Sequence, residues 1–290
     1  MQDPAPLGKW QAGRLGVGEL PAARAVYLRS DSLLVRDFWP ENPRLTPGGF
    51  LAFKPRSPRS CCTRCMTRYL ADYSEYQGSL TAADFHRAEF QVMNFKISHD
   101  LEQARVNTRT PAQIAAARKL GLGIASYHWL TGDHSGADQA RYAAGCMRGL
   151  GILTGTMHTV DVEEQTDADA EKPPTEAHVR DYVTTMQEML GRPIAIYTGD
   201  WWWTARGRGW NGAQLTPYLM AAPNEKYLDR YPGDKSAHWR AGWGGWSNLS
   251  IMQYAGEAPL LYPNGTKSTI KVSKSAIRDE AVWRALTGGN

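Results

Sequence analysis

Asp161 and Glu163 are the two residues whose type and spacing best suit catalysis. They lie in the stretch TVDVEEQT, residues 159–166, where a short apolar run ends in three acidic side chains. In an extended chain, Asp161 and Glu163 point to one face and Glu164 points to the other. Neighbouring carboxyl groups raise the cost of ionising each other, and proteins use such pairs to make one acid and one base. The alternative explanation is that these residues only begin a polar loop after a strand.

The chain around this stretch alternates between strand-like and helix-like patterns from residue 66 onward. Short apolar runs predict buried strands, whereas capped or Ala-rich runs predict helices, such as the one that Thr110 is expected to cap. The expected strands cover residues 69–74, 90–98, 122–130, 152–163, 193–199, 217–222, 249–255 and 269–276. The expected helices cover residues 81–90, 110–121, 135–151, 175–191 and 279–288.

This alternation predicts the fold class and the location of the site. Alternating strands and helices imply a parallel sheet covered by helices, and about eight strands favour closure into an α/β barrel. The active site of such a barrel belongs at the carboxyl ends of its strands. The residues expected at these ends are Asp161 and Glu163, together with Asp72, Tyr127, His128, Tyr197, Gln253 and Tyr254.

Residues 1–65 differ from the rest of the chain. They contain eight of the 17 prolines. They also contain ten Lys or Arg residues and five Asp or Glu residues, whereas the rest of the chain contains 23 Lys or Arg and 24 Asp or Glu. They show no sustained helical or strand periodicity, so we expect a disordered or non-native extension before an organised domain at 66–290. Met66 directly precedes that domain and is a candidate for the true first residue.

Composition argues against several partners and cofactors. The net charge of +4 does not support nucleic-acid binding, because the basic excess is confined to the first 65 residues. No apolar run approaches the ~20 residues that span a bilayer, and the N-terminus lacks the apolar core of a signal peptide. Cys61, Cys62 and Cys65 have no second Cys/His pair at zinc-finger spacing, so we expect no metal and no other cofactor.

Several motifs together resemble one enzyme family. ADYSEYQG, FKIS, GIASYHWL, VDVE, IAIYTGDWWW and IMQYAG occur in this order within residues 68–288. In this combination the chain is similar to the glycoside hydrolase family 25 lysozymes, the muramidases of phage endolysins and secreted bacterial lysozymes. The resemblance implies a modified TIM-like barrel, (β/α)5(β)3, in which the first five strands alternate with helices and the last three do not. It also implies cleavage of the β-1,4 bond between N-acetylmuramic acid and N-acetylglucosamine in peptidoglycan.

The resemblance assigns roles to individual residues. Glu163 matches the catalytic acid, Asp161 matches its partner, and Asp72 matches the aspartate of the first motif. The positions that match the sugar groove are Tyr127, His128, Tyr197, Gln253 and Tyr254. Because the N-terminus shows no signal-peptide pattern, we expect a phage endolysin that is made in the host cytoplasm and acts on the wall after release. We also expect the protein to be a monomer.

Other residues suggest roles through their place along the strands. Within Trp201–Trp203, alternating side chains would point opposite ways, so at least one indole should pack inside while Trp201 stacks on a sugar ring. His158 lies three positions before Asp161 and should face away from it, as a core histidine. Asp100, after the FKIS motif, is expected either to border the groove or to begin a loop.

Two departures from the family pattern leave alternatives open. Ser273 stands where family members usually carry another aspartate, and Met252 stands where a tryptophan commonly precedes Gln-Tyr. A smaller carboxylate set is compatible with a non-catalytic peptidoglycan-binding barrel, although retention of Asp72, Asp161 and Glu163 favours catalysis. A metal-dependent deacetylase is a third alternative, and it predicts bound zinc.

Overall fold

The computed structural model describes most of the chain after residue 66. The described residues are 67–74, 77, 89–102, 108–163, 171–207, 209–223, 227–228, 230–261 and 266–289. The predicted extension at 1–65, Met66 and nearly all of the predicted helix at 81–90 lie outside the described residues. Among the helices that are described, none combines the length and the apolar character needed to cross a bilayer.

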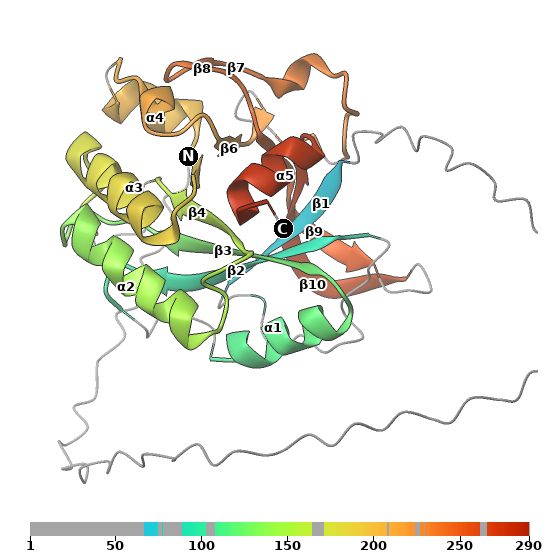
Figure 1. Cartoon of the computed structure of the whole chain (residues 1–290). Coiled ribbons are helices and arrows are strands. Elements are labelled where there is room, and N and C mark those ends of the chain that lie inside the picture. The colour runs from blue at the N-terminus through green and yellow to red at the C-terminus, as the bar shows by residue number, and fades with distance from the viewer. Residues whose placement is uncertain are drawn as a thin grey trace, which may run out of the picture. The chain divides into compact units, whose positions relative to one another are not determined.

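Eight of the described strands close into a barrel (Figure 1) in the order β1-β10-β9-β6-β5-β4-β3-β2. These strands are β1 (Arg68–Tyr73), β2 (Val92–His99), β3 (Gly123–Trp129), β4 (Met157–Asp161), β5 (Ala195–Tyr197), β6 (Leu219–Ala221), β9 (Ile251–Leu261) and β10 (Lys267–Ile277). Neighbouring strands are parallel, except that β10 is antiparallel to both β9 and β1. The predicted α/β barrel is therefore confirmed.

Helices connect the early strands of the barrel, whereas no α-helix is described in the connections between β6, β9 and β10. The helices are α1 (Thr110–Lys119), α2 (Gly136–Gly149), α3 (Glu176–Leu190), α4 (Asp200–Arg206) and α5 (Glu280–Thr287). Figure 1 shows α1, α2 and α3 on the outside of the barrel, with α2 against α3. The hairpin of β7 (Arg240–Trp243) and β8 (Trp246–Asn248) lies between β6 and β9 in the sequence, where no α-helix is described. This is the change from alternating to helix-free connections that the (β/α)5(β)3 pattern requires.

Local sequence signals predict the end of α3 correctly but misplace the start of α1 and of β4. Gly191 ends α3 with a left-handed backbone (φ 64°), a conformation that glycine adopts without steric cost. Thr110 was expected to cap α1, but the capping position is Arg109 and Thr110 is the first helical residue. The predicted strand at 152–163 is also too long, because β4 begins only at Met157.

The tryptophan run forms a helix instead of the extended segment that alternation implied. Trp201–Trp203 lie in α4, where successive side chains are roughly 100° apart and not on opposite faces. Trp202 and Trp203 are buried, whereas Trp201 is 44% exposed. The expectation that at least one indole packs inside is confirmed, but the alternation on which it was based is wrong.

The barrel interior has an apolar floor. Inward-facing residues near the starts of the strands pack against Val282, Trp283 and Leu286 of α5. Trp283 lies against Gly123, where an added Cβ would come within 3.0 Å of the indole, and Arg68 lies 5.2 Å from the indole ring centre. Helix α5 therefore closes the amino ends of the strands, and the carboxyl ends are left to form the site.

Replacing Trp283 with Ala should destabilise the protein by about 3–5 kcal/mol, because a large buried side chain leaves a cavity under the barrel. Chemical denaturation followed by circular dichroism measures the change. Arg284→Ala is the matched control, since that side chain is 62% exposed and its loss should cost no more than about 0.5 kcal/mol. Equal stability of the two variants would show that α5 does not hold the floor of the barrel.

Candidate active site

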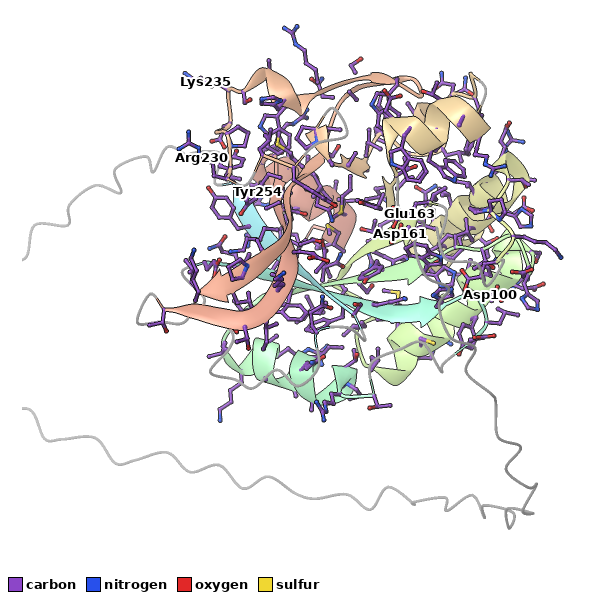
Figure 2. The ribbon with its side chains drawn as sticks, turned by 180° about the vertical axis from the view of Figure 1, so that it is seen from behind. Asp100, Asp161, Glu163, Arg230, Lys235 and Tyr254 are labelled. Atoms are coloured by element: carbon purple, nitrogen blue, oxygen red, sulfur yellow. The ribbon has the colours of Figure 1, made fainter. Side chains whose placement is uncertain are left out.

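A cavity of about 280 Å³ at the carboxyl ends of the barrel strands holds Asp72, Asp161 and Glu163. Figure 2 shows Asp161 and Glu163 next to each other at the end of β4. The remaining lining residues come from the neighbouring strands and loops: Ser74, Asn94, Lys96, Tyr127, Trp129, Thr159, Tyr197, Met220, Tyr227, Gln253 and Ser273. The structure thus brings the three acids selected from the sequence into one space.

Asp72 is held at the end of β1 by two amide groups. Its carboxylate accepts a hydrogen bond from Asn94 Nδ2 at 2.7 Å and another from Gln253 Nε2 at 3.2 Å. Burial raises the pKa of Asp72 to about 6, because the loss of hydration outweighs the two hydrogen bonds that favour the ionised form. Asp72 is therefore ionised near neutral pH and gains a proton in mildly acidic solution.

Asp161 and Glu163 form an electrostatically coupled pair. Burial is the main reason that the pKa of Asp161 is raised well above its usual value, and the nearby Glu163 raises it further while Lys96 opposes the shift. Burial raises the pKa of Glu163 to about 7. Two carboxyl groups in such surroundings cannot both ionise easily, so the pair holds one proton at near-neutral pH. This is the arrangement that general acid catalysis requires.

Gln253 links the acids to two tyrosines. Its Oε1 accepts hydrogen bonds from the hydroxyl groups of Tyr197 at 2.9 Å and Tyr227 at 3.2 Å. Since a tyrosine hydroxyl can donate to the oxygen but not to the NH₂ group of an amide, these bonds orient Nε2 toward Asp72. Burial, reinforced by Glu163 and Asp161, raises the pKa of Tyr197 and keeps this hydroxyl protonated.

Three buried polar atoms in the cavity have no protein partner among the described residues. They are Asn94 Oδ1, Thr159 Oγ1 and Asp161 Oδ1. Buried polar groups in folded proteins are nearly always hydrogen-bonded, so atoms of this kind mark positions where a polar ligand can bind. A sugar carries many hydroxyl groups that can form hydrogen bonds with such atoms.

Aromatic side chains from β3 form one wall of the cavity. Tyr127 and Trp129 are two positions apart and share the inward face of the strand. The Trp129 ring stacks on His99 with centres 5.7 Å apart, and Lys96 Nζ lies 5.7 Å from the Trp129 ring centre. Asn94, Lys96 and Trp129 were not selected from the sequence, although alternation along β2 and β3 could have indicated them once the inward face was known.

The structure does not bring His128 or Tyr254 to the cavity, which corrects the expectation that both contact sugar. His128 is fully buried, lies 2.7 Å from Ser98 Oγ and 3.1 Å from Gln139 Oε1, and stacks on Tyr182. Burial lowers the pKa of His128 to about 4. Both residues directly follow an inward-facing residue and so point outward.

Tyr254 packs against Tyr69 and Tyr231 instead. It lies well apart from Asp161 and Glu163 in Figure 2. Trp201 is exposed on α4 and is not among the residues that line this cavity.

Three other expectations can be located in the structure. His158 is a core residue, as predicted, with its ring nitrogens 2.9 Å from Ser126 Oγ and from Tyr182 Oη. Asp100 does not line the cavity, and its carboxylate lies 2.7 Å from His134 Nδ1. Ser273 lines the cavity opposite Asp72, its Cα partner across the β1–β10 pair, so a hydroxyl occupies the place of the aspartate expected from the resemblance.

Neither a metal site nor the cavity between α1 and α2 indicates a second catalytic centre among the described residues. Within the described ranges, no group of three or more His, Cys, Asp or Glu side chains is arranged to hold a metal ion. A larger cavity of about 570 Å³ lies between α1 and α2, where Arg141 and Tyr142 border it. None of its described lining residues carries a carboxyl group, whereas three of those in the smaller cavity at the strand ends do.

The chain belongs to glycosyl hydrolase family 25, whose family model matches residues 71–260, and it is therefore a glycoside hydrolase. No curated protein matches the sequence. The fold is similar to that of a bacterial lysozyme from Streptomyces coelicolor, with a TM-score of 0.60, 17% identity, and coverage of 77% of this chain and 98% of the other.

Two fungal enzymes have the same fold. A family GH25 lysozyme from Aspergillus fumigatus has a TM-score of 0.59 and 18% identity, with coverage of 77% of this chain and 100% of the other. A muramidase from Acremonium alcalophilum has a TM-score of 0.55 and 21% identity, with the same coverage. These TM-scores show a common fold, but at identities this low they do not show a common substrate.

The raised pKa of Glu163 predicts a loss of stability as the pH rises. Below pH 4.5, the usual value for Glu, the folded and unfolded states both hold the proton and stability is unaffected. Between pH 4.5 and about 7 only the folded state holds it, so the free energy of unfolding falls with increasing pH. Glu163→Gln removes this titration and should be up to about 3 kcal/mol more stable than wild type at pH 8, but equal to it at pH 4.

Urea denaturation of both proteins at the two pH values measures this difference. Glu188→Gln, which removes an exposed carboxylate from α3, is the control and should follow the wild-type curve. Parallel pH profiles for wild type and Glu163→Gln would contradict the burial of an ionisable Glu163.

Proposed function

We propose that the protein is a peptidoglycan hydrolase that cleaves the β-1,4 bond between N-acetylmuramic acid and N-acetylglucosamine. The proposal depends on one observation, the placement of Glu163 beside Asp161 in a cavity that also holds Asp72. Glycosidic bonds are hydrolysed by pairs of carboxyl groups that differ in protonation. The proteins with similar folds are described as lysozymes or muramidases, which supports the choice of substrate.

Accessibility suggests which acid of the coupled pair donates. Burial raises the pKa of both carboxyl groups, and the charge of Glu163 raises that of Asp161 further, so the proton that the pair holds is shared between them. Glu163 is only partly buried, whereas Asp161 is 7% exposed, so Glu163 is the more accessible to a bound sugar. Glu163 is therefore the group that protonates the leaving glycosidic oxygen.

The rest of the cavity stabilises the sugar during bond cleavage. The Tyr127 ring offers a stacking surface, and Asn94 Oδ1 and Thr159 Oγ1 can bond to sugar hydroxyl groups. As the bond to the leaving oxygen breaks, positive charge develops on the sugar ring, and the ionised Asp72 stabilises it. Water then adds to the anomeric carbon and returns a proton to the carboxylates, which restores the starting state.

Replacing Glu163 with Gln should reduce the release of reducing sugar from purified peptidoglycan by about 100- to 10,000-fold, because the general acid is lost. The product ends are identified by mass spectrometry, and muramic acid is expected at the reducing end. Glu188→Gln should retain wild-type activity, which separates loss of the acid from a general effect of charge.

A non-catalytic binding barrel is the competing function. Ser273 is the observation that favours it, since a hydroxyl lines the cavity where the resemblance leads us to expect a carboxylate. Wall binding without release of reducing ends by the wild-type protein would establish that function. Glucosamine at the new reducing ends would instead indicate cleavage of the other glycosidic bond. The role as a phage endolysin stays a prediction.

The pH dependence of kcat/KM should be bell-shaped, with its maximum between about pH 6 and about pH 7. Activity falls below about pH 6 as Asp72 gains a proton, and it falls above about pH 7 as Glu163 loses its own. Asp72→Asn should abolish the acidic limb while lowering the maximum. An unchanged acidic limb in Asp72→Asn would assign that limb to another group.

A further inference from the structure

The last two strands of the barrel extend beyond it as an arm. Strands β9 and β10 each have eleven residues, and β1 pairs only with residues 273–277 of β10. Residues 267–272 therefore continue past the end of β1, paired with β9 on one side (Figure 1). We call residues 256–261 and 267–272 the β9–β10 arm. No described strand pairs with the other edge of its outer part, where Gln77 Nε2 donates a hydrogen bond to the backbone oxygen of Lys271 at 3.2 Å.

A groove runs from the catalytic cavity along this arm. It has a volume of about 460 Å³, and its lining includes Gln77, Glu257, Thr269, Lys271 and Ser273. Ser273 also lines the catalytic cavity, so the two spaces meet at this residue. Five consecutive residues of β10, 269–273, line the groove, and the pairing of β10 with β9 is irregular between Lys267 and Lys271, so the groove follows the edge of the arm.

An irregularity in β9 directs a carboxylate into the groove. Val272 pairs with Ala258 and Lys274 pairs with Ala255, so Gly256 and Glu257 both lie opposite a single residue of β10. This is a β-bulge, and Glu257 adopts a positive φ of 46°, which is uncommon for a residue other than glycine. Bulges and strained backbone of this kind occur beside functional sites, where they redirect a side chain.

Lys271 and Glu257 place opposite charges side by side on the groove. Glu257 Oε2 lies 3.6 Å from Lys271 Nζ, and the two side chains are 87% and 61% exposed. Ion pairs this exposed contribute little to stability, so a ligand can replace the contact at small cost. A ligand with one carboxylate and one amino group can bond to both charges, and a short peptide has this chemistry.

We propose that the groove along the β9–β10 arm binds the peptide attached to the muramic acid of the substrate, with Lys271 contacting a peptide carboxylate and Glu257 a peptide amino group. This inference depends on the proposed function, because peptidoglycan carries its peptides on muramic acid. A muramic acid bound at the carboxylates beside Ser273 would direct its peptide into the groove. The enzyme would then distinguish peptide-bearing glycan from bare glycan.

The test compares two forms of one substrate with the full-length protein. Uncrosslinked peptidoglycan strands are used directly or after an amidase has removed their peptides, and kcat/KM is measured from the release of reducing ends. Wild type should prefer the peptide-bearing strands by about three- to fivefold, the size expected for exposed charge contacts. In Lys271→Ala and in Glu257→Gln, the ratio of the two kcat/KM values should fall toward one.

Lys267→Ala is the matched control, because this exposed lysine lies on the same arm but does not line the groove, and it should keep the wild-type ratio. Circular dichroism confirms folding of each variant. Equal kcat/KM for both substrates in wild type, or an unchanged ratio in Lys271→Ala and Glu257→Gln, would overturn the inference. Release of no reducing ends from either substrate would instead overturn the proposed function.

Discussion

The burial of three carboxyl groups in one small cavity is the constraint on which the rest of the structure depends. Desolvation raises the pKa values of Asp72, Asp161 and Glu163, and the acids also repel one another. The fold tolerates this cost because the amide groups of Asn94 and Gln253 bond to one acid and Lys96 favours ionisation of another. These helper residues come from β2 and β9, so the charged site forms only when the barrel is closed.

The barrel separates its apolar and polar contents into two layers. Aliphatic side chains at the amino ends of the strands meet α5, and polar side chains at the carboxyl ends surround the cavity. The layer at the carboxyl ends is also a connected network, since Tyr197 and Tyr227 both bond to Gln253, which bonds in turn to Asp72. A rigid floor beneath this network holds the acids at fixed separations, which general acid catalysis needs.

The change in architecture after β5 gives the two sides of the site different properties. Helices α1, α2 and α3 cover the side built from the early strands. The side built from β9 and β10 carries the arm, which extends past the residues of β10 that pair with β1. Chemistry and recognition can therefore reside on different parts of one sheet, with Ser273 at the point where the two cavities meet.

The sequence by itself determined the alternating order of elements, the barrel class and the placement of Asp161 and Glu163 on one face, because these follow from the two-residue period of a strand. That period also says that only one residue of a consecutive pair can face inward. It does not say which one, and only the closed barrel decided that Tyr127 and Gln253 line the cavity while His128 and Tyr254 point outward.

Contacts between distant parts of the chain were likewise beyond the sequence. Gln253 and Asp72 are 181 positions apart, and the β-bulge that turns Glu257 toward Lys271 follows from the pairing of β9 with β10. The tryptophan run shows the same limit at short range, since local pattern could not distinguish α4 from an extended segment. Local periodicity fixes which side chains share a face, whereas burial and long-range pairing decide what that face meets.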